Sequence, residues 1–218
     1  MMKYLSVSFL IFFCCISISN YAQSMVYSCN GKYRIELPSK LELQSSELSN
    51  INKINLQGKK PQINISTQSG RIIFQQKGLN ANVRSAFSKY CRVIIEYFTD
   101  NRNVPTFGRG DAIVVDRELL YTVYEAVKEN CRISETPLIN ILSTEAMEVN
   151  GFPTLYYSYR RMGWQKEDGS RQPPVIVNVY TIFNKYELVK LTFSYRESER
   201  KEWKSIHNNI ISTFSFIH

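Results

Sequence analysis

Apolar residues recur along this chain with two different spacings, and the last fifth of the sequence holds the clearest example of each. Residues 175–183 and 187–195 are rich in β-branched and aromatic residues, and only Asn184-Lys185-Tyr186 separates them. This pattern predicts a β-hairpin. Alternation in the second strand places Lys190, Thr192 and Ser194 on one face and the apolar residues on the other.

A helical spacing follows the hairpin. Ser198 can cap a helix whose first turn is acidic. The apolar positions at i, i+3, i+7, i+8 and i+11 are Trp203, Ile206, Ile210, Ile211 and Phe214. We expect this stripe to pack on one face of the sheet, because an amphipathic helix is stable in water only when its apolar side is covered.

Two further segments show helical periodicity. Apolar residues recur from Val83 to Phe98 in one continuous stripe, which predicts a helix there. Residues 99–110 contain Pro105 and two glycines and predict a loop, and residues 112–115 fit either a short strand or the start of the next helix. Asp116 can cap that second helix, whose apolar positions run from 119 to 131.

Strand patterns occupy most of the remaining chain. Residues 33–37 alternate and stop at Pro38, and residues 62–67 and 71–75 flank a turn at Gly70. Residues 138–147 and 153–162 are joined through Asn150-Gly151, a strong hairpin signal. The order of elements predicts an α+β fold with a mainly antiparallel β-sheet covered by helices.

The N-terminus has the features of a secretory signal peptide. A short basic start is followed by a mainly apolar run of fourteen residues, Leu5–Ile18, and a polar region that ends at Ser24. The apolar run is shorter than a membrane span requires. We therefore expect residues 1–24 to be removed and residues 25–218 to form a single domain, monomeric and secreted or periplasmic. Phe13 precedes Cys14, which disfavours a lipoprotein.

The charge pattern argues against a nucleic-acid partner. The formal net charge is +8, or one less once Lys3 leaves with the signal. Basic and acidic residues alternate rather than form blocks, as in residues 196–204. A mixed surface of this kind is typical of a solvated exported protein.

Three cysteines remain after the signal peptide, so an oxidising compartment allows one disulfide and one free thiol. Two neighbouring antiparallel helices would leave Cys91 and Cys131 too far apart to pair. We predict a bridge between Cys29 and Cys131, and three reduced, buried cysteines remain the alternative.

Catalytic motifs are absent from the sequence. It contains no Gly-x-Ser-x-Gly, no His-Glu-x-x-His, no phosphate loop and no Cys-x-x-Cys, and its two histidines are His207 and His218. We therefore predict no metal, no cofactor and no catalytic residues. The alternative is a small secreted hydrolase with an unfamiliar site around His207.

The best binding candidates are Tyr157, Tyr159, Arg161 and Trp164, because these residue types dominate interface energetics. The first three alternate onto one face of a strand, and the tryptophan begins the loop that follows. The alternative is structural: both tyrosines cover the sheet under a helix, and the indole folds back onto Met162.

Three stretches resemble the PsbP-like α/β/α sandwich family, whose bacterial envelope members include the DcrB-like proteins. They are Tyr33-Arg34-Ile35-Glu36-Leu37-Pro38, the hairpin of residues 175–195, and the ending from Trp203 to Ser215-Phe216. The resemblance implies a central antiparallel sheet with helices on both faces and a non-enzymatic binding or assembly role. We expect an exported binding module whose partner is a protein or an envelope component.

Overall fold

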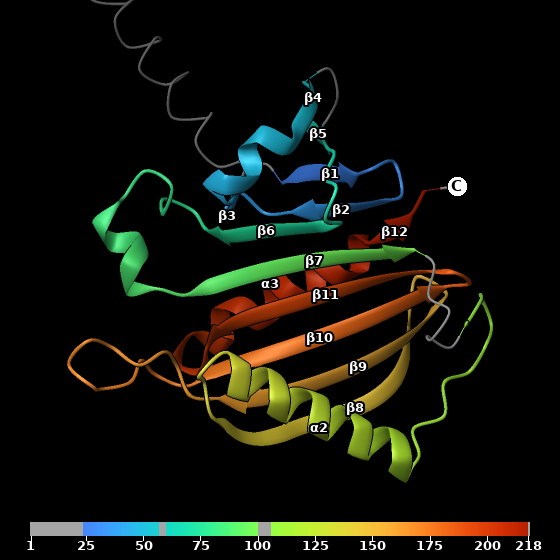
Figure 1. The fold of residues 1–218 in the computed structure, drawn as a ribbon. Coiled ribbons are helices and arrows are strands. Elements are labelled where there is room, and N and C mark those ends of the chain that lie inside the picture. The colour runs from blue at the N-terminus through green and yellow to red at the C-terminus, as the bar shows by residue number, and fades with distance from the viewer. Residues whose placement is uncertain (1–23, 57–59, 100–105, 218) are drawn as a thin grey trace, which may run out of the picture.

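The fold was obtained as a computed structural model, which describes residues 24–56, 60–99 and 106–217 (Figure 1). The signal peptide predicted over residues 1–24 lies outside these residues except for Ser24. Two β-sheets form the body of the molecule, and both contribute to one large hydrophobic core. For example, Tyr27 of the smaller sheet packs edge-on against Phe74 of the larger sheet, with ring centroids 4.7 Å apart.

The larger sheet is antiparallel throughout. Within the described ranges its seven strands lie in the order β3 (Leu41–Leu43), β6 (Arg71–Gln76), β7 (Cys91–Thr99), β11 (Glu187–Arg196), β10 (Val175–Asn184), β9 (Phe152–Arg161) and β8 (Leu138–Val149). The predicted hairpin is β10–β11, and the predicted Asn150-Gly151 turn joins β8 to β9. Both residues of that turn have positive φ, 51° and 78°, as a two-residue hairpin turn requires.

The smaller sheet lies beside the β3–β6 edge of the larger one (Figure 1). Its five described strands are, in order, β12 (Ser215–Phe216), β2 (Tyr33–Leu37), β1 (Met25–Cys29), β5 (Gln62–Ile65) and β4 (Ile51–Asn55). The β1–β5 pair is parallel and the other pairs are antiparallel. The strands on either side of Gly70 therefore do not pair with each other, since β5 belongs to this sheet and β6 to the larger one.

Two α-helices cover opposite faces of the larger sheet: in Figure 1, α3 (Arg200–Thr213) lies behind it and α2 (Arg117–Ile133) in front. The predicted apolar stripe of α3 is confirmed, because Trp203, Ile210, Ile211 and Phe214 are buried in the large core. Helix α2 begins at its predicted cap, where the Asp116 carboxylate accepts from the Leu119 backbone N–H at 2.8 Å.

Short 3₁₀ turns complete the described elements: η1 (Ser45–Asn50), η2 (Arg84–Ser88) and η3 (Glu197–Glu199). The last of these moves the start of α3 one residue past the predicted cap, so that Glu199 precedes the helix. Residues 112–115 belong to neither a helix nor a strand. No helix among the described residues combines the length and hydropathy of a membrane span.

The prediction of a helix over residues 83–98 is wrong. Only Arg84–Ser88 is helical, as the 3₁₀ turn η2, and Cys91–Thr99 forms strand β7 between β6 and β11. Cys91, Val93 and Ile95 point into the core, and the residues between them face the other way. Pairing on both edges outweighs the weak helical preference of this β-branched segment.

The predicted Cys29–Cys131 bridge is not present, because both residues are buried free thiols. Cys29 lies on β1 in the core that both sheets share, whereas Cys131 lies in a separate cluster under α2. A disulfide requires Cα atoms within about 7 Å, and these two clusters are on opposite faces of the larger sheet. Cys91 is also a buried free thiol.

Candidate functional site

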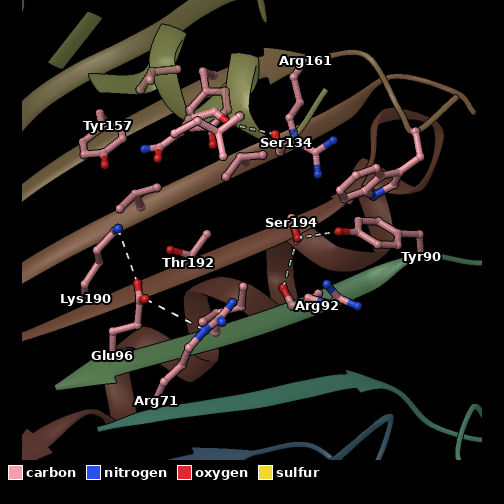
Figure 2. Close-up of a pocket in the computed structure, with 18 residues that line it drawn as sticks. Arg71, Tyr90, Arg92, Glu96, Ser134, Tyr157, Arg161, Lys190, Thr192 and Ser194 are labelled. Carbon is pink, nitrogen blue, oxygen red and sulfur yellow. Dashed lines mark hydrogen bonds and ion pairs between the residues drawn. The ribbon is translucent and has the colours of Figure 1, made fainter. Parts of the chain in front are cut away.

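A pocket of about 350 Å³ lies on the α2 face of the larger sheet. Helix α2 covers only part of this face, where Val123, Val127 and Cys131 pack over residues of β8 and β9. The C-terminal turns of α2 form one wall of the pocket, and β9, β10, β11 and β7 form its floor (Figure 2). Its size is at the small end of the roughly 300–1,000 Å³ typical of ligand sites.

Strand register arranges the floor in rows that cross the sheet. One row is Tyr159, Val177, Ser194 and Arg92, the next is Tyr157, Val179, Thr192 and Ile94, and the third includes Lys190, Glu96 and Arg71. The first two rows begin with an aromatic ring on β9, continue over valine on β10, and reach hydroxyl groups on β11. The floor is therefore apolar beneath α2 and polar toward β7.

The third row contains the only carboxylate among the described residues that line the pocket. Glu96 lies 3.4 Å from the Lys190 ammonium and 3.9 Å from the Arg71 guanidinium (Figure 2). All three side chains are partly exposed, so each pair contributes at most about 1 kcal/mol to stability. Glu96 nevertheless neutralises part of the positive charge at this end of the pocket.

Two guanidinium groups at the other end have no acidic partner among the described residues. Arg161 is only 9% exposed, and its Nη1 donates to the Met162 carbonyl at 3.0 Å. Arg92 lies on β7, and its side chain makes no hydrogen bond or ion pair with any part of the chain that the structure describes. This end of the pocket therefore holds uncompensated positive charge.

Hydroxyl groups lie beside these cations. Tyr90 Oη and Ser194 Oγ are 3.1 Å apart, and Ser194 Oγ also donates to the Arg92 carbonyl at 3.5 Å (Figure 2). The hydroxyls of Tyr157 and Tyr159 have no partner within the described ranges. Burial, followed by the nearby Glu96 charge, raises the pKa of Tyr157 to about 12, and burial also raises the pKa of Tyr159. Both phenols stay protonated at neutral pH and can donate.

All four residues proposed from the sequence line this one pocket. Tyr157, Tyr159 and Arg161 extend from β9, and Trp164 follows three residues after the end of that strand. Both tyrosines also pack against the cluster under α2, so they cover the sheet and face the pocket together. The Trp164 side chain is 49% exposed at the pocket's rim.

The loop that carries Trp164 is fixed on both sides. The Trp164 backbone carbonyl accepts a hydrogen bond from the Gln172 backbone N–H at 2.9 Å. A Cβ at Gly163 would lie 2.6 Å from the Gln172 carbonyl oxygen, so only glycine allows the two strands of the loop to approach this closely. Arg171 Nη1 donates to the carbonyls of Gly163 and Glu135, which ties the loop to the segment after α2.

Sequence reasoning missed the contributions of β7 and of α2. Arg92, Ile94 and Glu96 were hidden inside the wrongly predicted helix, although their alternation with Cys91, Val93 and Ile95 is a strand signal. Asn130 and Ser134, at the end of α2, carried no signal of their own. The shared face of Lys190, Thr192 and Ser194 was predicted, and it forms part of the floor.

His207 belongs to α3, on the opposite face of the larger sheet from the pocket, and its side chain points toward the sheet. It is 5% exposed, and its ring packs against Phe193 and Tyr180 at centroid distances of 4.5 and 5.3 Å. Neither ring nitrogen has a hydrogen-bond partner among the described residues. Burial, with a smaller effect of Lys204, lowers its pKa from 6.5 to about 4. A general base must reach its nucleophile, so this position does not support the hydrolase alternative.

The architecture is that of a PsbP-like α/β/α sandwich. The solution structure of cyanobacterial PsbP (CyanoP) from Synechocystis sp. PCC 6803 matches with a TM-score of 0.51 and 14% identity, and the match covers 91% of this chain and 95% of that one. The resemblance seen at the two ends of the sequence is thereby confirmed at the level of the fold.

Two other solved structures are similar at lower scores. A protein of unknown function from Pseudomonas aeruginosa, described as a putative regulator, has a TM-score of 0.42 and 10% identity over 74% of this chain and 94% of that one. The Ran-binding protein Mog1p of Saccharomyces cerevisiae has a TM-score of 0.43 and 10% identity over 85% and 90%. No protein-family model and no curated protein sequence matches the chain.

Proposed function

We propose that this protein is a non-enzymatic binding module exported to the cell envelope, and that the pocket on the α2 face holds its partner. The observation that carries the proposal is the convergence of Tyr157, Tyr159, Arg161 and Trp164 on one pocket together with polar residues of β7 and β11. Tyrosine and tryptophan give large contact area with a polar group at one end, and arginine gives directional hydrogen bonds; these residue types dominate binding energy at interfaces.

Export rests on the signal-peptide pattern at the N-terminus, and the partner is accordingly a protein or another envelope component. The PsbP-like fold is compatible with this role, because strands form the floor of the pocket and helix α2 forms one of its walls. Strands hold binding side chains more precisely than loops do. The exported chain acts as a monomer in this account.

Site-specific photocrosslinking in the native cell tests the proposal. A photoreactive phenylalanine analogue replaces Trp164 in one variant and Tyr186 in the other. Tyr186 is an ideal control because it is aromatic, 73% exposed, and at the β10–β11 turn, away from the pocket lining. We expect a discrete crosslinked product from position 164 only. Identical products at both positions, or none at position 164, would contradict the proposal.

A further inference from the structure

The pocket has an excess of hydrogen-bond donors. Donor groups without a partner in the described part of the chain include the guanidinium of Arg92 and the hydroxyls of Tyr157, Tyr159 and Thr192. Arg161 uses one guanidinium nitrogen on a backbone carbonyl and has further N–H groups to give. None of these donors is among the fully buried unpartnered atoms of the described residues, so water can reach them in the free protein. A ligand that brings acceptors can replace that water, and this pocket therefore favours such a ligand.

The charged residues of the pocket also favour an anionic ligand. Arg71, Arg92, Arg161 and Lys190 are opposed only by Glu96 among the described lining residues, and Glu96 already pairs with two of those four cations. The two arginines that remain lie at the end of the pocket where Ser194 and Tyr90 are found (Figure 2). Guanidinium groups bind carboxylates and phosphates through paired N–H donors, and this binding strengthens where water is partly excluded.

The rest of the lining is apolar and aromatic. Val177 and Val179, both buried, form the centre of the floor, and Tyr90, Tyr157 and Tyr159 pack against them. Trp164 adds a further aromatic ring to the lining. A ligand that satisfied the arginines would therefore leave its remaining atoms against valine and aromatic surface. This combination of a few convergent polar groups with apolar walls is typical of small-molecule sites.

From these contacts we infer that the pocket binds an organic oxyanion: a carboxylate or phosphate held by Arg92 and Arg161, attached to an apolar or aromatic body that lies between Trp164 and the β9 tyrosines. The inference rests on the proposed function and specifies the chemistry of its ligand. The oxyanion belongs either to a free small molecule or to a group displayed by a larger envelope partner.

Nitrogen–proton correlation NMR provides the test, because the chain has two tryptophans, Trp164 at the pocket and Trp203 in the core. The purified protein is titrated with phenylacetate, phenyl phosphate and the neutral analogue phenylacetamide. We expect both anions to shift the Trp164 indole signal saturably, with the Trp203 signal unmoved as internal control. Phenylacetamide should bind about tenfold more weakly or worse, because a charged hydrogen bond is lost.

Matched variants locate the anion. Arg92→Gln should weaken phenylacetate binding about tenfold, whereas Arg84→Gln, on the exposed turn η2 and outside the pocket, should leave it unchanged. An unchanged Trp203 signal verifies that each variant is folded. Equal binding of phenylacetate and phenylacetamide, or equal effects of the two variants, would overturn the inference.

The outcomes separate this inference from the proposed function. If the pocket binds the neutral analogue as well as the anion, or if position 164 captures a partner while no anion shifts Trp164, the oxyanion inference fails and the binding role stands. If no probe binds and position 164 captures nothing, both fail. When the anions do bind, native mass spectrometry of protein isolated from its own cells distinguishes the sources: a small added mass identifies a free molecule, and a crosslinked macromolecule identifies a displayed group.

Discussion

Glu96 on β7 and Lys190 on β11 are register partners in the larger sheet, and their side chains meet 3.4 Å apart on the floor of the pocket. Arg71 approaches the same carboxylate from β6 at 3.9 Å. One acid is thus shared by two cations, and the remaining arginines of the pocket have no acidic partner in the part of the chain that the structure describes. The charge available to a ligand is set by this one carboxylate.

Removing that carboxylate should strengthen anion binding. Glu96→Gln frees Lys190 and Arg71, and we expect phenylacetate to bind about fivefold more tightly, which corresponds to about 1 kcal/mol from one added charge near the site. The stability of the fold should change by no more than about 1 kcal/mol, because the pairs are partly exposed. The Trp164 indole titration measures the affinity.

Glu148→Gln is the matched control, since Glu148 is exposed on β8 and outside the pocket lining. Both variants change the net charge equally, so a difference between them reports the position of Glu96. Weaker anion binding in Glu96→Gln, or the same gain in both variants, would contradict the charge argument.

The two tryptophans should have opposite roles. Trp203 is 1% exposed, and its Nε1 donates to the Glu199 carboxylate at 3.1 Å, so Trp203→Ala should lower the free energy of unfolding by about 3–5 kcal/mol. Trp164→Ala should cost less than about 1 kcal/mol, because its side chain is half exposed, yet it should abolish probe binding. Urea unfolding measures the two losses of stability, and isothermal titration calorimetry measures phenylacetate binding to Trp164→Ala, which lacks the reporting indole. Similar losses of stability in the two variants, or phenylacetate binding retained by Trp164→Ala, would refute this division.

Buried His207 should make the protein sensitive to acid. Its pKa is about 4 in the folded state against 6.5 for an ordinary histidine, so the unfolded chain binds the proton more readily. Stability is therefore complete above about pH 6.5 and falls as the pH decreases toward 4, by about 3 kcal/mol in total. Urea unfolding across this pH range measures the loss.

His207→Leu isolates this effect. Leucine has a similar volume and no ring nitrogens, so it removes both the titration and the two unpartnered polar atoms. The variant should be at least as stable as the wild type at neutral pH and should lose less stability on acidification. Parallel pH profiles for the two proteins would show that His207 does not carry the sensitivity.

The three cysteines should be present as thiols. Burial is the largest effect on each, and it raises the pKa of Cys29, Cys91 and Cys131, which suppresses the reactive thiolate in the folded protein. We expect almost no alkylation of the native protein. After denaturation without reductant, mass spectrometry should find each of these three residues alkylated, whereas a Cys29–Cys131 bridge would leave only Cys91 modified.

Local patterns predicted the elements whose preferences agree with their tertiary environment. The β10–β11 hairpin, the Asn150-Gly151 turn, and the α3 stripe each have a consistent spacing and clear boundaries. The prediction failed for strand β7, because its apolar residues fit both the helical and the strand period. The neighbouring strands β6 and β11, both distant in sequence, decide between those periods, and no local pattern contains that information.

In the candidate site, too, local patterns predicted some features, and others depend on strands that are distant in sequence. Residue type alone identified four lining residues on and just after β9, and alternation placed Lys190, Thr192 and Ser194 on one face. What the sequence could not show is that this face is the one beside α2, or that Arg92 would stand across the sheet from Tyr159. Those relationships depend on strand order, which the long connections between hairpins leave open.

A crystal structure of the protein with phenylacetate, at the concentration that saturates the Trp164 signal, would show directly whether the pocket on the α2 face binds an organic oxyanion. We predict that the carboxylate contacts Arg92 and Arg161 and that the phenyl ring lies against Trp164 and the β9 tyrosines. A pocket that stays empty, or phenylacetate bound elsewhere on the molecule, would contradict it.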